Sequence, residues 1–348
     1  MPTGTLHIDL GAVAANWRAL DAMSAPGCET GACVKADGYG LGAAPVARAL
    51  MDAGCRAFFV ATADEGATLR AALGPEPRIY VFYGHMPGDA GVLAGADLVP
   101  MLCSVAQLMT HLEATPRHPF GLQLDTGMNR LGLKMTEWAA VAETALRARP
   151  VLVMSHLASA DDPSAPTNAA QLARFREMTD GIAVPRSLAA TGGTLLGPGY
   201  HFDMTRPGIG LYGGAPFADA APVVALELPV VACLNVAAGE RVGYDGTWTA
   251  PADTRVATVA GGYADGLFRA LSPRMEVMAG PVPCPVVGRV SMDLLAVDVG
   301  HLDSDPEAVT VLDAARGVDA LAAAAGTIGY EVLTSLGRRY RRTYRAAG

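Results

Sequence analysis

The chain has 348 residues, 51% of them hydrophobic and 17% charged, so it can bury a large core and should form one large domain or two unequal ones. Its formal net charge of −8 gives no broad positive field, which argues against nucleic acid and anionic membranes as partners. The first residues lack the basic start and apolar core of a secretory signal, and no apolar run approaches the roughly 18 residues that a membrane helix needs. We therefore expect a cytoplasmic protein.

From about residue 30 to residue 212, short apolar runs alternate with longer Ala/Leu-rich stretches of helical period, as in βα units with buried parallel strands. Eight such units favour a (β/α)8 barrel of the TIM type, whose site lies at the C-terminal ends of the strands. An open doubly wound sheet is the alternative. The predicted strands are Ala32–Ala36, Ala57–Ala61, Arg78–Phe82, Asp97–Leu102, Phe120–Leu124, Val151–Ser155, Arg186–Ala190 and a weak one near His201–Met204. The predicted helices include Ala43–Ala53, Asp64–Leu73, Ser104–Glu113, Thr136–Arg149 and Asn168–Met178.

After Gly214 the pattern changes to short Val-rich runs separated by Pro and Gly, which predicts a mostly β second domain. We place the barrel at residues 11–218 and the β domain at residues 219–348, with residues 1–10 packing as a strand with the second domain. The runs that predict its strands are Val223–Val236, Arg255–Ala260, Pro283–Val290 and Leu294–Val299.

Near its end the chain carries a basic stretch, for which we expect solvated charges with Tyr340 and Tyr344 turned inward. Its arginines are Arg338, Arg339, Arg341, Arg342 and Arg345.

No metal site is predicted. The six cysteines are scattered without a C-x-x-C pair or a histidine at zinc-finger spacing, so reduced thiols are expected. His156 lies near Asp161 and Asp162, but their spacing offers no regular helical face, and the turn at Pro163 accounts for the aspartates as solvated loop residues.

The chain holds only two lysines, so any lysine chemistry must use Lys35 or Lys134. Lys35 ends an apolar run, and a lysine that leaves the C-terminal end of a barrel strand points into the mouth where ligands bind. Its desolvated amine would suit an imine or proton abstraction, although a snorkelling structural lysine is the alternative. Lys134 precedes a predicted helix start and is expected to be a surface amine.

Seven segments that follow one another along the chain carry a family resemblance: VKADGYGLG, LDTGMNRLG, SHLASAD, RPGIGLYG, GGYADG, GRVSMD and IGYE. Together they closely resemble the signature segments of alanine racemases, and the resemblance extends from Leu6 to Tyr344. It implies an isomerase that interconverts L-alanine and D-alanine through an external aldimine of pyridoxal 5'-phosphate. A serine or broad-specificity racemase of the same family, or a pyridoxal-phosphate-binding protein without turnover, is the alternative.

The resemblance also assigns the catalytic residues. It implies that Lys35 carries the cofactor as a Schiff base and is the base on the D-side of the substrate, and that Tyr263, from the partner subunit of a homodimer, is the base on the L-side. Arg206 resembles the arginine that contacts the pyridine nitrogen, and His156 the histidine that links this arginine to the tyrosine. Because an arginine does not give up its proton, the ring nitrogen stays unprotonated, which favours proton return over transamination.

The remaining assignments concern the cofactor phosphate and the substrate carboxylate, which hydroxyl groups, backbone amides and a guanidinium suit. The phosphate ligands implied are Tyr39, Thr191, the amides of Gly208 and Ile209, and Tyr330. Arg130 is implied beside the cofactor phenolate and the substrate carboxylate, and Met292 and Asp293 form the partner-chain segment that completes the carboxylate site.

Four departures from the family pattern bear on cofactor affinity and substrate range more than on activity. Leu41 replaces the usual His; Gln123 stands where many members have a lysine that becomes carbamylated and braces the arginine corresponding to Arg130; Ala190 and Thr191 replace Asn and Ser; and Ser291 replaces a frequent cysteine.

Overall fold

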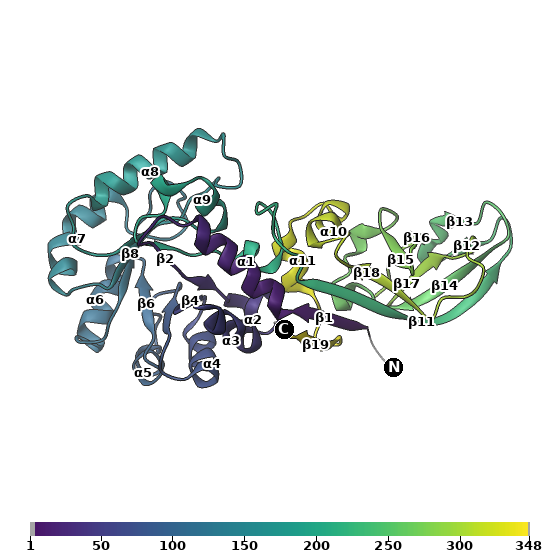
Figure 1. The fold of residues 1–348 in the computed structure, drawn as a ribbon, viewed down its shortest axis with the longest axis horizontal. Helices are drawn as coiled ribbons and strands as arrows, with labels where there is room; N and C mark the ends of the chain where they lie inside the picture. The colour runs from purple at the N-terminus through teal and green to yellow at the C-terminus, as the bar shows by residue number, and fades with distance from the viewer. Residues whose placement is uncertain (1–3, 347–348) are drawn as a thin grey trace. The chain divides into compact units, whose positions relative to one another are not determined.

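A computed structural model describes residues 4–346 and divides them into two compact units (Figure 1). The barrel unit comprises residues 13–211 and 215–220. The β unit comprises the described residues up to 12, residues 212–214, and the described residues from 221 onward. We describe each unit by itself.

The barrel unit is built on parallel strands that pair in sequence order and are largely buried. Continuous burial of this kind is typical of parallel sheets covered by helices. Seven strands form one ladder: β3 (Ala32–Cys33), β4 (Ala57–Val60), β5 (Arg78–Val81), β6 (Val99–Leu102), β7 (Gly121–Gln123), β8 (Leu152–Met154) and β9 (Arg186–Ser187).

Strand β10 (Met204–Thr205) closes this ladder into a ring. It pairs in parallel with β2 (Glu29–Thr30), and the Gly31 amide continues the pairing to the Thr205 carbonyl at 2.9 Å. On its other side, the Arg206 amide donates to the Ala189 carbonyl at 2.8 Å, just beyond β9. The predicted barrel is therefore confirmed, and the open-sheet alternative is wrong.

The helices of the barrel unit confirm the predicted helical stretches to within three residues. Thr62 and Ser104 cap two of them, because their hydroxyls accept the amides of Glu65 and Gln107 at 3.2 Å. The helices are α1 (Leu10–Met23), α2 (Lys35–Tyr39), α3 (Ala43–Ala53), α4 (Ala63–Leu73), α5 (Ala90–Gly95), α6 (Val105–Ala114), α7 (Met135–Arg147), α8 (Pro166–Thr179) and α9 (Thr191–Leu195), with the 3-10 turns η1 (Pro198–Tyr200) and η2 (Ile209–Tyr212).

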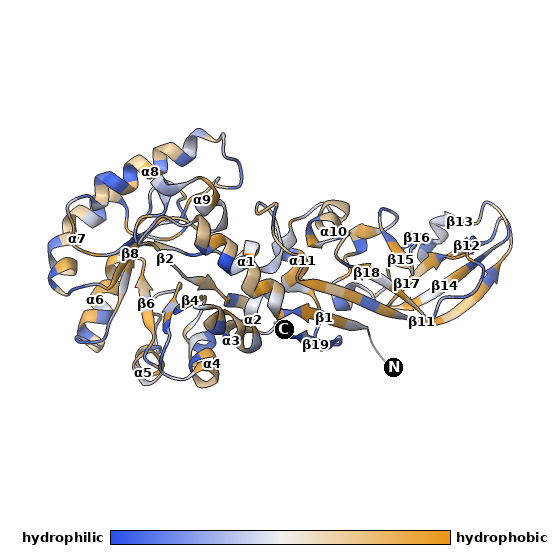
Figure 2. Cartoon of the chain, in the orientation of Figure 1, coloured by the Kyte–Doolittle hydropathy of each residue, from blue (hydrophilic) through white to orange (hydrophobic). Residues whose placement is uncertain are grey.

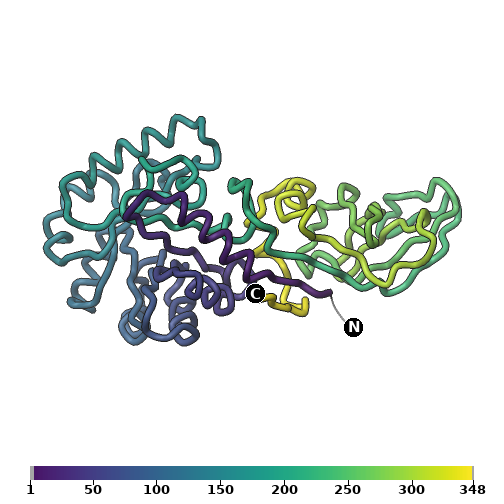
Figure 3. The backbone as a smooth tube through the Cα atoms, viewed as in Figure 1, coloured from purple at the N-terminus to yellow at the C-terminus, as the bar shows by residue number. Residues whose placement is uncertain are grey.

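The β unit is organised around one long strand, β11 (Val224–Val236), which pairs antiparallel with β1, β14 and β18. Figure 2 shows mainly hydrophobic residues along β11 and hydrophilic ones along β19. The first and last described strands lie side by side, because β1 pairs in parallel with β19 (Figure 3).

The sheet order is β14-β17-β16-β15-β18-β11-β1-β19, with a further pairing of β14 with β11. Its other strands are β1 (Thr5–Asp9), β14 (Thr254–Ala260), β15 (Glu276–Ala279), β16 (Val282–Val287), β17 (Leu294–Asp298), β18 (Ala308–Leu312) and β19 (Arg341–Arg345), and β12 (Arg241–Val242) pairs separately with β13 (Trp248–Thr249). The unit also contains η3 (Tyr244–Gly246), η4 (Tyr263–Asp265), η5 (Arg269–Leu271), α10 (Val318–Ala325) and α11 (Gly329–Ser335). Of the strand expected at residues 1–10, the first three positions lie outside the described residues.

The basic stretch is only partly as predicted. Tyr340 is buried, at 4% exposed, but Tyr344 is 40% exposed, so its inward orientation is wrong. The reason is that β19 is an edge strand with a neighbour on one side only. Within the described residues, no helix is long and apolar enough to cross a membrane. The cytoplasmic location stays a prediction.

A buried histidine pair joins the β5–α5 loop to α6. Nδ1 of His85 lies 3.0 Å from Nδ1 of His111. Nε2 of His111 lies 3.2 Å from the His118 carbonyl, which can only accept, so Nε2 carries a hydrogen and Nδ1 of neutral His111 accepts from His85. Burial is the main cause that lowers the pKa of His111 to about 4, and it also lowers the pKa of His85 against the opposing effect of Asp89.

We predict that acid loosens this part of the barrel. The unfolded chain binds a proton at His111 near pH 6.5, whereas the folded chain does so only near pH 4, so stability is lost as the pH falls between these values. From pH 7 to pH 5 the free energy of opening of α6, measured by hydrogen exchange, should fall by about 2 kcal/mol. The variant His111→Gln should show a smaller fall, and an equal fall in the variant would contradict the assignment.

Candidate active site

Lys35 is separated from the end of β3 by one residue and begins a turn with an unusual backbone. Ala36, Asp37, Gly38 and Tyr39 all have positive φ, between 52° and 62°, so the turn is left-handed. Such a conformation costs roughly 1–2 kcal/mol for each residue with a Cβ, and it persists only where the surroundings enforce it. The backbone therefore fixes Lys35 at the C-terminal end of a barrel strand.

Two carboxylates stabilise this turn. Glu65, on α4, accepts the Ala36 amide at 2.8 Å and the Ala61 amide at 2.7 Å, so it links the ends of β3 and β4. Asp37 accepts the Ala43 amide at 2.8 Å, where α3 begins. The two carboxylates accept backbone amides that have no acceptor in a regular helix or strand, because they lie at the ends of such elements.

Arg206 follows β10 and is buried, at 3% exposed. Its guanidinium donates to the Ser155 carbonyl at 2.8 Å and to the Ser187 hydroxyl, and its Cζ lies 5.9 Å from the centre of the Phe59 ring. Burial lowers the pKa of Arg206 to about 10, so the group stays cationic at neutral pH. Among the described residues, Arg206 forms no salt bridge with a carboxylate.

His156 follows β8 and is held through its backbone. Gln171, on α8, donates to the His156 carbonyl at 2.9 Å and accepts the Ala158 amide at 2.8 Å. Burial is the main cause that lowers the pKa of His156 to about 3, and the charges of Arg206, Arg130 and Lys35 add to it. The imidazole is therefore neutral at physiological pH, in a site that gathers three cations.

Beside these groups lies a set of donors suited to an anion. The Thr191 hydroxyl accepts the amides of Gly208 at 3.0 Å and Gly210 at 3.3 Å, which leaves its own hydrogen to be donated. A Cβ at position 208 would collide with the Tyr39 hydroxyl, so glycine permits this close approach. Helix η2 begins at Ile209, and the first amides of a helix have no acceptor within it.

Aromatic rings pack beside two cations, the partly buried Lys35 and the buried Arg206. Phe59 stacks on Tyr80 and Phe82, with ring centres 4.7 Å and 5.4 Å apart. Nζ of Lys35 lies 5.6 Å from the Phe82 ring, while Arg206 faces Phe59. These rings desolvate both cations on one side and offer each a weak cation–π attraction.

Arg130 lies on the loop after β7 and is exposed. Gln123 is buried below this loop, and its side-chain amide donates to the Leu131 carbonyl at 3.3 Å, next to Arg130 in sequence. Asp125 fixes the loop further by accepting the amides of Gly127 at 2.9 Å and Asn129 at 3.1 Å. Gln123 therefore braces the backbone beside Arg130.

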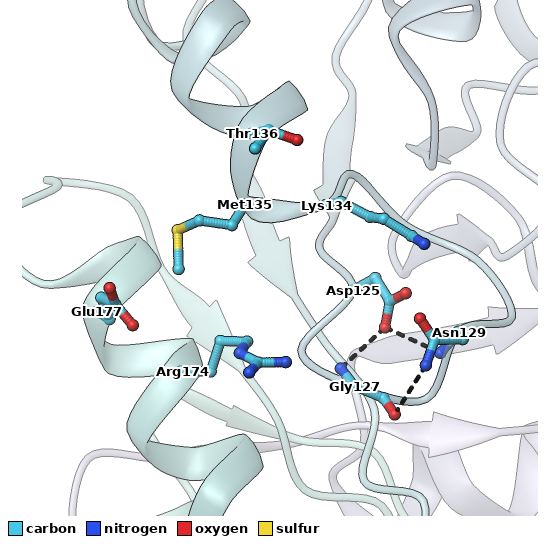
Figure 4. A pocket seen from close by; sticks show the side chains of 8 residues that line it. All are labelled: Asp125, Gly127, Asn129, Lys134, Met135, Thr136, Arg174 and Glu177. Carbon is cyan, nitrogen blue, oxygen red and sulfur yellow. Dashed lines mark hydrogen bonds between the residues drawn. The ribbon is translucent and has the colours of Figure 1, made fainter.

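Outside this loop, next to α7 and α8, is a pocket of about 440 Å³ with mixed charges (Figure 4). Lys134 lies at its rim and is exposed, in contrast to Lys35. The lining residues are Asp125, Gly127, Asn129, Lys134, Met135, Thr136, Arg174 and Glu177.

The other predicted site residues belong to the β unit. Tyr263 begins η4 and is 44% exposed. Its amide donates to the Ser291 carbonyl at 3.0 Å, and the Gly261 amide donates to the Asp293 carbonyl at 2.9 Å. The structure thus brings Tyr263, Met292 and Asp293 together on one corner, while Tyr330 lies in α11.

Three of the departures from the family pattern lie in common structural settings: Leu41 in the core, Ala190 just before a helix and Ser291 in a turn. Leu41 is fully buried, and Ala190 precedes the first residue of α9. The Ser291 amide donates to the Leu294 carbonyl at 2.9 Å, which makes it part of the turn before β17.

Both units match known families. Residues 8–216 match the model of the alanine racemase N-terminal domain, and residues 223–344 match that of the alanine racemase C-terminal domain. A protein named alanine racemase from Dinoroseobacter shibae is 65% identical over 344 residues, covering 99% of either chain.

Solved structures agree. The alanine racemase of Bartonella henselae, with covalently bound pyridoxal phosphate, is 35% identical with a TM-score of 0.93 and covers 99% of both chains. That of Streptomyces coelicolor A3(2) is 34% identical with a TM-score of 0.94, covering 99% of this chain and 98% of the other. Along the whole chain, sequence and fold thus define a single class of protein, in which a barrel domain is followed by a second domain. The chain belongs to the alanine racemase family, as predicted.

Sequence reasoning missed the residues that hold the site in place. Glu65, Gln171 and Phe59 act on backbone or on cations that lie far from them in the sequence. The sequence does not indicate these partners. Gln171 is one polar residue among others on its helix, and Glu65 only follows a capping threonine by three residues.

We predict that Glu65→Gln weakens the Lys35 turn. A glutamine offers one acceptor oxygen where the carboxylate serves two amides, one exposed and one partly buried, so one charge-assisted hydrogen bond is lost at a cost of about 1 kcal/mol. The thermal midpoint of the purified protein should fall. The matched control Glu143→Gln breaks only an exposed pair with Arg147 on α7 and should change it little; equal shifts in the two variants would refute this role.

Proposed function

We infer that the chain is an isomerase that interconverts L-alanine and D-alanine with pyridoxal phosphate, and we propose that Lys35 and Tyr263 are its two bases. The observation that carries the proposal is the Lys35 amine, held at the end of a barrel strand beside a buried guanidinium without a carboxylate, in a chain of this family. We propose that residues 11–218 form the cofactor-binding domain and residues 219–348 the second domain.

The donors of the barrel unit suit this cofactor. Lys35 would hold its aldehyde carbon, and the hydroxyls of Tyr39 and Thr191 with the amides of Gly208 and Ile209 would bind its phosphate. We propose Tyr330 as a further phosphate donor. When bound, the cofactor withdraws electrons from Cα of the amino acid and so makes its proton removable.

Arg206 would direct the reaction towards racemisation. With a pKa of about 10, its guanidinium keeps its protons at neutral pH and would donate a hydrogen bond to the ring nitrogen of the cofactor without protonating it. The cofactor would then withdraw electrons less strongly, which would favour return of the proton to Cα over its transfer elsewhere.

Inversion at Cα needs two proton-transfer groups on opposite faces. Lys35 would serve the D-side and Tyr263 the L-side, one taking the proton and the other returning one. His156 is neutral, so it can accept from Arg206 and donate to the Tyr263 oxygen, which favours the phenolate. Arg130 and the segment of Met292 and Asp293 would bind the substrate carboxylate.

We propose that Tyr263 acts from the partner subunit of a homodimer. The β unit exposes large apolar side chains, with Tyr244 at 70% and Met292 at 54% exposed. Exposed large apolar side chains are enriched at interfaces, and a second copy would cover them while bringing Tyr263 to the barrel. The exposed residues that we assign to this interface are Val231, Leu234, Tyr244, Tyr263, Met292 and Leu294.

Tyr263→Phe should abolish proton removal from L-alanine selectively. Racemisation rates cannot separate the bases, because the enantiomers have equal free energy and the two directions therefore share one kcat/KM. Incorporation of solvent deuterium into unreacted substrate reports one base at a time. It should fall on the order of 100-fold or more for L-alanine and much less for D-alanine.

The control for this experiment is Tyr344→Phe, which removes the hydroxyl of another exposed tyrosine of the β unit, outside the residues assigned to the interface, and should leave both exchange rates unchanged. Equal loss of exchange from both enantiomers in Tyr263→Phe would defeat the two-base assignment.

Mixing inactive Lys35→Ala and Tyr263→Phe proteins should restore activity. A mixed dimer would hold one site with both natural bases, so complete subunit exchange should give about a quarter of the natural activity. Subunit exchange is verified by native mass spectrometry. If mixed dimers form without activity, both bases come from one chain.

A further inference from the structure

The corner that carries Tyr263 is held by an arginine from the end of the chain. Nε and Nη2 of Arg339 donate to the two carboxylate oxygens of Asp265, each at 2.7 Å. Nη1 of the same guanidinium donates to Asp293, also at 2.7 Å. Asp265 ends the η4 turn that Tyr263 begins, and Asp293 follows Met292, so one side chain ties together two of the segments that the proposed function uses.

The backbone around this arginine is closely packed on the same turn. The Gly337 amide donates to the Asp265 carbonyl at 3.0 Å, and a Cβ at Gly266 would collide with the Ser335 carbonyl. From the other side, the Ala264 amide donates to the Met292 carbonyl at 3.0 Å. The turn of Tyr263 therefore lies between residues 291–293 and residues 335–339.

We propose that Arg339 is a positioning residue for the L-side proton transfer, because it fixes the Tyr263 turn and the Met292–Asp293 segment relative to one another. The inference rests on the proposed function, since it takes Tyr263 as the L-side base. Arg339 itself touches neither substrate nor cofactor in this assignment.

The charges show why an arginine is needed here. The Asp265 side chain is buried and also accepts the Gly262 amide at 3.1 Å, so it would be left as an unpaired buried carboxylate without Arg339. Asp293 is exposed, so its orientation depends on this contact. A guanidinium can bind one carboxylate with two nitrogens and a second with the third, whereas a lysine ammonium cannot reproduce this planar fork.

The test is deuterium exchange into unreacted L-alanine and D-alanine by the holoenzyme with Arg339→Met. Exchange from L-alanine should fall on the order of tenfold or more, because a base displaced by a fraction of an ångström transfers protons poorly, while exchange from D-alanine should stay within about threefold. Arg339→Lys keeps a charge and one contact, so its loss should be intermediate. Arg345→Met, which removes an exposed pair with Asp9 on the same sheet, should change neither rate.

The outcomes separate the two proposals. Equal losses from both enantiomers, or no loss from L-alanine, in Arg339→Met and Arg339→Lys would overturn the inference, provided that Tyr263→Phe shows its selective loss. If Tyr263→Phe shows no selectivity, the proposed function itself fails. If Arg339→Met does not fold, Arg339→Lys decides alone by the ratio of its two exchange rates.

Discussion

The site depends on the Arg206 guanidinium, which is buried in the barrel and forms no ion pair with a carboxylate of residues 4–346. Removing a cation from water is costly unless its donors are satisfied, and Arg206 meets this cost with a carbonyl, a hydroxyl and an aromatic face. Burial lowers its pKa only to about 10, so the charge persists, and that charge helps to lower the pKa of His156 to about 3. One buried group therefore contributes to two protonation states: a fixed cation at Arg206 and a neutral imidazole at His156.

The Lys35 turn illustrates how the fold maintains an unfavourable local geometry. Three residues with a Cβ adopt left-handed conformations in sequence, which no propensity favours, and the closed barrel supplies the compensation through Glu65 and the start of α3. The turn thereby fixes the backbone from which the Lys35 side chain extends.

The sequence predicted the barrel well because burial itself produces the pattern. The run Ala57–Ala61 predicts β4 (Ala57–Val60) and the run Arg78–Phe82 predicts β5 (Arg78–Val81), since both strands are buried on both faces. The reactive residues that the motifs imply through the family resemblance stay predictions. The sequence did not reveal the residues that support the site, because their partners lie far away in the chain. Ala36 lies 29 positions from Glu65, and Asp265 lies 74 positions from Arg339. The prediction that Tyr344 is turned inward was wrong, because a sequence pattern cannot show that β19 is an edge strand.

The two proposed bases are stabilised by different means, and the difference follows from their surroundings. Lys35 lies in a barrel whose hydrogen-bonded ring fixes the strand that precedes it. Tyr263 is half exposed on a short turn, which backbone contacts with residues 291–293 hold on one side and the Gly337 amide on the other. Such turns open more readily than core strands, so accurate placement there requires an added constraint. The charge-assisted contacts of Arg339 with two aspartates provide one, and they join the Tyr263 turn to the segment that follows Met292.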